Sequence, residues 1–357
     1  MINIMSKRMY SGGAACAFLV VLAATAVAWS IESRVTNKAE AAQSRELLLA
    51  AYSVPKEAYE KRLLPEFQRQ WKERTGEDIR FRSSYGASGA QARAIIGGFE
   101  ADIAALSVQG DLDQIVKAGL VTHDWRKGPH QGYVSASVVA FGVRKGNPRG
   151  IQTWEDLAKP GLAVLYPNPK TSGGAMWDII AIYGAGLRLA DAKQGSPEAY
   201  ASDLLKRIQQ NVKVMDKSGR ESVTTFERGV GDVIVTYENE LLPRIKSGRP
   251  IDVILPQQTV LIENPVALVD RHVDKHRVRD VAEAFVAFLH SDDAQRAFIE
   301  SDFRPVSATA AQGSQSFPKP SQLFTVADLG GWEKIADLLF GPQGVWSRTV
   351  EELARGR

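Results

Sequence analysis

The chain has 357 residues, of which 44% are hydrophobic and 24% are charged, and its formal net charge at pH 7 is +3. This length exceeds the usual size of one domain, so we expect two lobes. The composition is that of a folded globular protein rather than a disordered one. Basic residues form no block interleaved with aromatic residues, and this argues against nucleic-acid binding.

The first 45 residues differ from the rest of the chain. Lys7 and Arg8 precede an apolar run over residues 12–29, and small-x-small triplets occupy residues 26–28 and 39–41. This order of charge, apolar run and small residues is typical of an export signal. About 18 apolar residues can also just span a bilayer. The sequence therefore predicts either a signal peptide over residues 1–45 or an anchor through residues 12–29, and a periplasmic location in both cases.

The single cysteine, Cys16, lies inside this leader and is followed by further apolar residues. A lipid-attachment cysteine would follow the apolar run, so we do not expect a lipoprotein. The exported part has no cysteine for a disulfide, a nucleophile or a zinc site.

From residue 47 onward, apolar strand-like segments alternate with helix-like segments. This βαβαβ rhythm with short connections predicts a parallel sheet covered on both faces. The first group comprises strands at 47–52, 79–81 and 102–106, and helices at 53–76, 88–96 and 111–118.

The alternation then restarts after a long strand-like run at 133–143, which is suited to crossing between two lobes. The second α/β unit comprises segments 154–158, 163–165, 175–189, 197–210, 212–215, 233–237, 240–247 and 251–255. A second crossing strand is expected at 260–269, followed by helices at 278–290 and 294–301 and a tail that ends with a helix near Trp332.

Four connections end a strand with hydroxyl or glycine residues ahead of a helix: residues 52–55, 85–89, 171–174 and 218–220. In open α/β sheets, ligands bind beyond the carboxyl ends of the strands. A helix start offers unpaired N–H groups and the positive end of the helix dipole, both of which favour an anion. Helix capping explains any one of these loops by itself. Together the four predict an anion site in a crevice between two lobes.

Signatures of catalysis and of nucleotide binding are absent. The Ser-Gly-Gly run at 172–174 lacks the spacing of a phosphate-binding P-loop, and there is no Gly-x-Ser-x-Gly elbow. The histidines lie away from the four loops. His272 and His276 are four residues apart in a charged stretch, which we interpret as a solvated turn and helix entry rather than a metal site. We expect a structural role for Asp102 and Asp232.

Several stretches resemble the periplasmic sulfate/thiosulfate-binding proteins, which are the receptors of sulfate ABC importers. They are residues 84–94 (SYGASGAQARA), 143–148 (VRKGNP), 167–175 (PNPKTSGGA), 224–233 (TTFERGVGDV), 238–240 (ENE) and 330–332 (GGW). The resemblance covers nearly all of residues 47–332. It implies a type II binding-protein fold of two α/β lobes, each a mixed sheet flanked by helices and joined by crossing strands. The expected lobes are 46–132 with 260–305, and 133–259, with 306–357 packing back across both.

The resemblance also implies how the ligand is held. The family binds a dehydrated sulfate through neutral donors rather than through lysine or arginine, without a cofactor or metal. The positions carried over are the hydroxyls of Ser88 and Ser172, the backbone N–H groups of Ser53, Gly173, Gly174 and Gly219, and the side chain of Tyr237. Arg93 and Arg220 are expected to brace the loops or bias the local field rather than touch the ligand. The implied partners are membrane permease subunits, and the protein is expected to be a monomer.

Two departures from the family pattern affect the site. Ser53 stands where the family commonly has Asp, and Tyr237 stands where sulfate receptors have Trp and thiosulfate receptors look more like Phe. Tyr237 either donates its O–H to the ligand or lines an apolar wall, so both sulfate and thiosulfate remain open.

A donor-only pocket suits sulfate because the ion is a dianion without a proton at neutral pH. Protonated phosphate would point an O–H at a donor and leave a polar group unpaired, at a cost on the order of 1–3 kcal/mol. Two classes of function follow: a receptor for sulfate, with thiosulfate, molybdate and phosphate as alternatives, or an exported hydrolase of sulfate or phosphate esters. The lack of a nucleophile–base pair favours the receptor.

Overall fold

A computed structural model describes residues 45–190, 196–312 and 317–356. The predicted leader or anchor therefore lies outside the described residues, apart from its last residue, Arg45. Within the described ranges, no helix combines the length and apolar character that crossing a bilayer requires.

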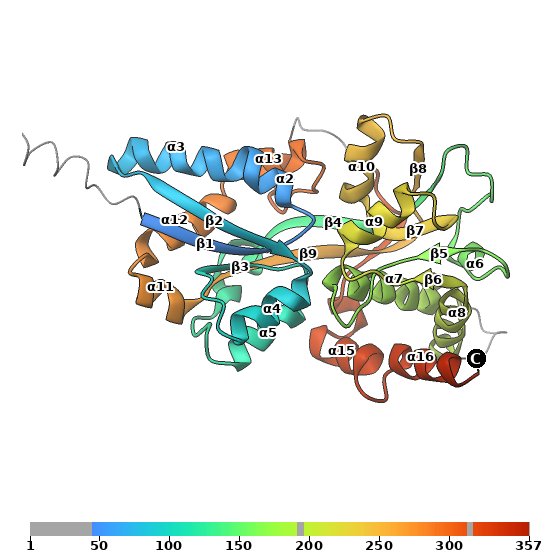
Figure 1. Ribbon diagram of the computed structural model, residues 1–357. Coiled ribbons are helices and arrows are strands. Elements are labelled where there is room, and N and C mark those ends of the chain that lie inside the picture. The colour runs from blue at the N-terminus through green and yellow to red at the C-terminus, as the bar shows by residue number, and fades with distance from the viewer. Residues whose placement is uncertain (1–44, 191–195, 313–316, 357) are drawn as a thin grey trace, which may run out of the picture.

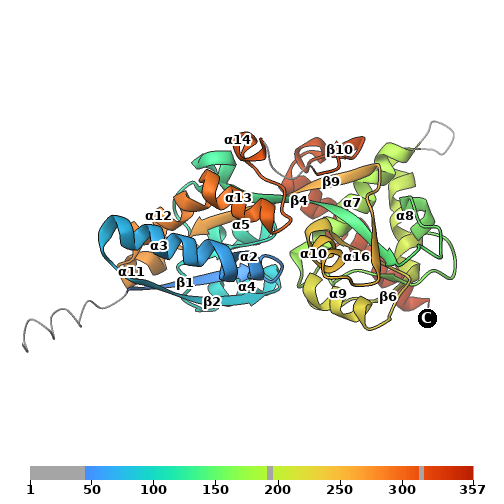
Figure 2. The same cartoon turned by 90° about the horizontal axis from the view of Figure 1, so that it is seen from above.

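Two α/β lobes lie side by side and are linked by long strands (Figures 1 and 2). The strands are β1 Arg45–Tyr52, β2 Ile79–Gly86, β3 Ile103–Ala105, β4 Tyr133–Arg144, β5 Val164–Leu165, β6 Val212–Val214, β7 Val233–Tyr237, β8 Ile251–Ile254, β9 Gln258–Leu268 and β10 Gln322–Phe324. The helices are α2 Lys56–Ala58, α3 Leu64–Thr75, α4 Ser88–Ile96, α5 Gln109–Lys117, α6 Trp154–Leu157, α7 Gly173–Leu189, α8 Pro197–Asn211, α9 Gly219–Glu227, α10 Glu238–Lys246, α11 Asp270–His276, α12 Arg279–Leu289, α13 Asp292–Glu300, α14 Ala308–Ala311, α15 Trp332–Phe340 and α16 Val345–Arg355. A π-helical turn, Tyr59–Leu63, joins α2 to α3, so the predicted helix over 53–76 is nearly continuous.

The first lobe is built around β1, which is parallel to both β2 and β3. Its last six residues are buried, as expected for a parallel strand with both faces covered. Successive side chains serve opposite layers: Leu49 belongs to the core that contains α3 and α12, and Ala50 to the core that contains α4 and α5. The first layer is aromatic at its centre, where Phe285 contacts Phe67 and Phe81 at ring-centroid distances of 5.0 and 4.9 Å.

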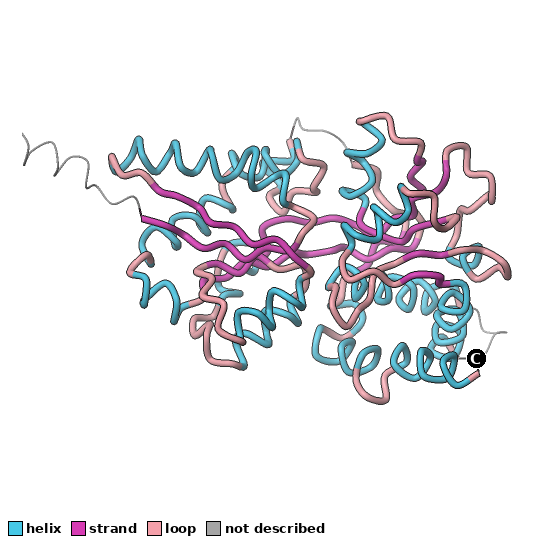
Figure 3. Tube along the Cα trace, in the orientation of Figure 1, coloured by secondary structure: helices cyan, strands magenta, loops and turns pink. Residues whose placement is uncertain are grey.

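The predicted crossing strands are β4 and β9. The first half of β4 pairs antiparallel with β9, and its second half pairs antiparallel with β7 and β8. At its other end β9 pairs with β3, where Ile103 lies opposite Leu268. Both strands therefore continue from one lobe into the other (Figure 3). The antiparallel pairings make the sheets mixed, as the family resemblance implied, whereas the alternation of strands and helices by itself predicted a parallel sheet.

In the second lobe, β5 is parallel to β6 and β7, and α7 lies at the centre of the packing. Helix α7 is buried on almost every side, including Gly184 and Gly186. A Cβ at Gly184 would lie 2.3 Å from the ring of Phe324, and one at Gly186 would lie 2.6 Å from the Cα of Ala201. The small residues in α7 thus let neighbouring elements approach its backbone.

The chain ends with two helices beneath α7 and α8 in Figure 1, where the sequence predicted one. Helix α15 contacts both α5 and α7, and Trp332 meets Trp177 edge to face at 4.9 Å between ring centroids. The additional helix, α16, packs on α8, and the indole N–H of Trp346 donates to the Gln209 side chain at 3.1 Å.

The interpretation of the His272–His276 stretch as solvated is wrong. These residues lie in α11, and His272 is only 8% exposed, with its Nδ1 2.8 Å from the Ala101 carbonyl oxygen. His276 lies between Glu100 and Asp102. The charged neighbours masked an i, i+4 pair that turns inward from the helix. Among the described residues, no group of three or more potential ligands could hold a metal ion.

Candidate anion-binding site

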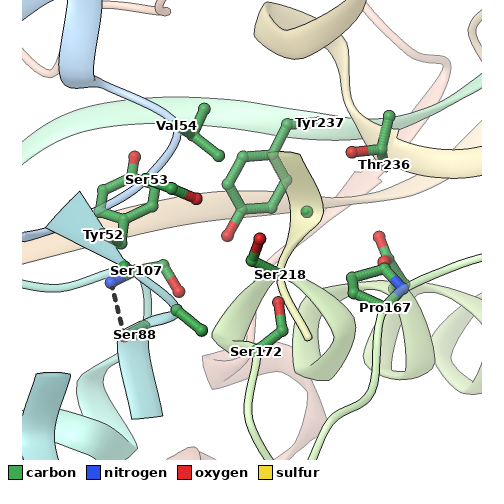
Figure 4. A pocket seen from close by; sticks show the side chains of 15 residues that line it. Tyr52, Ser53, Val54, Ser88, Ser107, Pro167, Ser172, Ser218, Thr236 and Tyr237 are labelled. Carbon is green, nitrogen blue, oxygen red and sulfur yellow. Dashed lines mark hydrogen bonds between the residues drawn. The ribbon is translucent and has the colours of Figure 1, made fainter. Parts of the chain in front are cut away.

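A small cavity lies between the lobes, beyond the ends of β1, β2 and β7 (Figure 4). It is narrow, because only about 10 Å³ of it is open to the centre of a water-sized sphere. It is lined by Tyr52, Ser53, Val54, Gly86, Ala87, Ser88, Ser107, Pro167, Ser172, Gly174, Asp178, Ser218, Gly219, Thr236 and Tyr237. Six of the seven predicted site residues are in this set, and Gly173 lies directly beside it.

Helix α7 begins at the cavity with a capped first turn. Ser172 is its N-cap, and the Ser172 Oγ accepts the N–H of Ala175 at 3.4 Å. The preceding N–H groups, those of Gly173 and Gly174, belong to the first turn and so have no acceptor within the helix. They lie at the positive end of the 17-residue helix, as the sequence predicted.

Helix α9 also begins at the cavity and repeats this arrangement. Ser218 is the N-cap and accepts the N–H of Glu221 at 3.2 Å, which leaves the first amide of the helix, Gly219, unpaired within it. A Cβ at Gly219 would meet only Val54, at 4.0 Å. The amide of Gly219 therefore lies close to the loop that follows β1.

Helix α4 also starts at the cavity, without a side-chain cap. The Ser88 Oγ accepts the N–H of Ser107 at 3.0 Å. Burial raises the pKa of the nearby Asp111 to about 6, against an opposing hydrogen bond from Ser88. A hydroxyl has one proton, so Ser88 can donate either to Asp111 or into the cavity.

Several buried polar atoms in the cavity wall lack a hydrogen-bond partner within the described part of the chain. The hydroxyls of Tyr52, Ser107 and Tyr237 and both carboxyl oxygens of Asp178 are in this group. In Figure 4 the hydroxyls of Tyr237, Ser107, Ser172 and Ser218 point towards a common space. A buried polar group without a partner is unfavourable, so this wall is built to receive hydrogen bonds from, or donate them to, a bound molecule.

The wall provides donors without a formal positive charge, because none of the lining residues in the described ranges is Lys, Arg or His. The two arginines near the site contact protein groups instead. Arg220 donates to Glu57 at 2.8 Å and to the Val54 carbonyl at 3.1 Å, and Arg93 donates to the Lys170 carbonyl at 3.3 Å. Both join one lobe to the other, which confirms that they brace the loops.

The lobes meet closely around the cavity. The indole N–H of Trp177 on α7 donates to the Ser107 carbonyl at 2.7 Å. A Cβ at Gly173 would lie 2.1 Å from the Ser107 Oγ. A glycine is therefore needed at position 173 for this approach, whatever its amide binds.

Sequence reasoning missed three polar residues of the wall: Thr236 within β7, and Ser107 and Asp178. Ser107 follows β3 at its carboxyl end, the same location that identified the other loops. Asp178 lies four residues after Gly174 and so shares its face of α7. For Ser107 and Asp178 the position in the predicted element was the available indication.

Comparisons with known proteins agree with this geometry. The family of bacterial extracellular solute-binding proteins matches residues 47–304, and the chain belongs to this class. A sulfate-binding protein of Synechococcus elongatus is 40% identical over 355 residues, 99% of each chain. A thiosulfate-binding protein of Pseudomonas aeruginosa is 34% identical over 308 residues, covering 85% of this chain and 91% of that one.

The solved structure of the sulfate-binding protein SubI from Mycobacterium tuberculosis is similar in fold and sequence. It has a TM-score of 0.75 and 36% identity, covering 83% of this chain and 99% of that chain. Within the solute-binding proteins, this chain is therefore a member of the sulfate/thiosulfate-binding family.

The close approach at Gly173 gives a test of lobe closure. In Gly173→Ala, the added methyl collides with Ser107, and overpacking of this kind costs about 1–3 kcal/mol, so we expect the lobes to stay apart. Small-angle X-ray scattering in one sulfate-containing buffer should give a larger radius of gyration than for the parent protein. Gly110→Ala on α5, where a Cβ would meet nothing within 4 Å, is the control. Identical scattering from all three proteins would refute the close contact.

Proposed function

We propose that the protein captures sulfate in this cavity and delivers it to the permease of an ABC importer. The observation that carries the proposal is a closed wall of hydroxyls and helix-start amides with no basic residue among its described members. The names of its relatives at 40% and 36% identity support the same ligand.

The chemistry of the wall suits a fully deprotonated oxyanion. Amides at the starts of α7 and α9 can only donate, and each hydroxyl has one proton to give. Hydrogen bonds to a charged acceptor are stronger than those between neutral groups, and the surrounding protein excludes the water that would weaken them. Sulfate accepts at every oxygen, whereas the O–H of hydrogen phosphate would need an acceptor.

Thiosulfate is the second candidate, because relatives named for thiosulfate match at 34% and 32% identity. The choice depends on Tyr237. Its ring is 2% exposed, and its hydroxyl is one of the unpartnered atoms in the wall. A phenolic donor here favours an oxygen of sulfate over the larger, weakly accepting sulfur of thiosulfate.

An exported ester hydrolase fits the site less well. The residues that line the cavity in the described ranges include no histidine to act as a base. Membership of the solute-binding family also indicates binding rather than turnover. We place the protein in the periplasm, outside the inner membrane where its permease would lie.

Calorimetric titration of the leaderless protein with sulfate, thiosulfate, molybdate and phosphate tests the proposed function. We expect the tightest binding for sulfate at neutral pH. Failure to bind sulfate, or tighter binding of another anion, would contradict the assignment.

Removing the hydroxyl of Ser172 should weaken sulfate binding. Ser172→Ala loses one hydrogen bond to a charged group, worth about 1.5–3 kcal/mol, and we expect a corresponding rise in the dissociation constant by calorimetry. The substitution also removes a helix cap. Ser291→Ala is a matched control, because Ser291 caps α13 through the N–H of Ala294 at 3.3 Å. Equal affinities for the two variants would show that Ser172 acts only as a cap.

Tyr237→Phe distinguishes a donor from an apolar wall. We expect sulfate affinity to fall by about 1.5–3 kcal/mol, the range for a hydrogen bond to a charged group, while thiosulfate affinity falls less. Calorimetry with both anions measures the difference. Tyr183→Phe, at a tyrosine on α7 outside the cavity wall, controls for the loss of a phenolic hydroxyl. Unchanged sulfate affinity in Tyr237→Phe would assign the ring to the wall.

A further inference from the structure

Asp178 is an acidic group in the wall of a site proposed for a dianion. It lies on α7, is 1% exposed, and contributes to the lining of the cavity. Neither carboxyl oxygen has a hydrogen-bond partner within the described residues. This combination of burial, location and missing partners has no role in the binding scheme described so far.

An ionised Asp178 would be doubly unfavourable. A buried carboxylate without a cation or donors is poorly solvated, and its charge would repel a dianion in the same cavity. Sulfate has no proton to donate to it. A protonated carboxyl has one O–H and can donate it, as the other lining groups do.

The titratable groups that the described residues place around Asp178 provide no compensating cation. Asp178 acts electrostatically on Tyr166 after β5 and Tyr237 at the end of β7, and burial raises the pKa of each tyrosine, so both are neutral. Asp111 on α5 and Glu240 on α10 also act on Tyr237. Arg220 and Arg244 are each paired with Glu240, at 3.1 and 2.9 Å. For Asp178, burial is the cause of the pKa shift, and it holds the pKa well above its ordinary value.

We propose that Asp178 is protonated when the anion is bound and donates a hydrogen bond within the site as a further neutral donor. The inference rests on the proposed function and adds that the sulfate-bound protein carries a proton on Asp178. Anion binding and protonation of Asp178 favour each other, so a site in which Asp178 has ionised takes up one proton as sulfate enters.

This linkage fixes the sign of the pH dependence. While Asp178 is protonated in the free protein, sulfate affinity does not depend on its titration. Above the pKa of Asp178 in the free protein, affinity falls by about tenfold per pH unit, since one proton must be bound with each anion.

Asp178→Asn is the informative variant, because the amide has the same shape, retains an N–H donor and cannot ionise. Sulfate affinity is measured by calorimetry between about pH 6 and about pH 10, in buffers of different ionisation enthalpy so that proton uptake is counted. We expect the parent protein to lose affinity and take up a proton at the alkaline end. Asp178→Asn should lose this decline and this uptake. The same alkaline decline and uptake in Asp178→Asn would overturn the proposal.

Asp111→Asn is the matched control. Asp111 is a second buried carboxyl near the site, with a pKa raised to about 6, and it is absent from the cavity lining. We expect Asp111→Asn to keep the alkaline decline of the parent protein. A decline that disappears in Asp111→Asn and persists in Asp178→Asn would assign the proton to Asp111 and refute the proposal.

Phosphate binding tests whether Asp178 acts as a protonated donor, as proposed, or as an ionised acceptor. An ionised Asp178 would accept the O–H of hydrogen phosphate, so the parent protein would bind phosphate, and Asp178→Asn would bind it more weakly because the neutral amide oxygen is a weaker acceptor. We expect no such weakening, and its observation would overturn the proposal. If the parent protein binds no sulfate at any pH, the proposed function itself fails, which is a different outcome from sulfate binding without proton uptake.

Thermal unfolding without ligand provides an independent readout. A carboxyl whose pKa is raised on folding contributes stability that is full below its unfolded pKa and is lost as pH rises towards the folded value. Asp178→Asn should therefore have a higher melting temperature than the parent protein, by a margin that grows with pH. A margin that is absent or shrinks as pH rises would contradict a buried, protonated Asp178.

Discussion

Capture of an anion in this cavity depends on removing water from around a charge that no lysine, arginine or histidine of the described wall neutralises. Hydrogen bonds from amide dipoles become strong enough to replace hydration only when they converge and solvent is excluded. The starts of α4, α7 and α9 satisfy the first condition, because three separate segments begin their helices at one cavity. Contact between the lobes satisfies the second, and it is closest where Gly173 meets Ser107.

Much of this arrangement could be predicted from sequence because its determinants are local. The Ser-Gly-Gly run at 172–174 specifies a cap followed by two open amides, and the same logic applies at Ser218 and Gly219. The length of the segment at 133–143 likewise predicted a strand that spans both lobes. Each of these features is determined by residues adjacent in the chain.

The features that sequence reasoning missed are set by contacts between distant residues. Asp178 reads as an ordinary polar position on a helix until the surrounding elements bury it completely. His272 has charged neighbours, yet it turns inward to the Ala101 carbonyl 171 positions away. Gly173 has a second role besides offering its amide. Because it lacks a side chain, the Ser107 hydroxyl of the other lobe can approach it closely. Such environments are created only when the chain folds.

Because β4 and β9 are each hydrogen-bonded in both lobes, neither lobe can deform internally without breaking strand pairs. If the cavity opens, we expect the bending to fall where the pairing of β4 changes from β9 at Val138 to β7 at Val139, so that each lobe moves as one unit. During closure, the amides and hydroxyls of one lobe would then reach the bound ion together rather than one after another. An ion that fits one of these contacts poorly would therefore hinder closure of the whole lobe. A single poor hydrogen bond would then weaken all the contacts that this lobe makes with the ion.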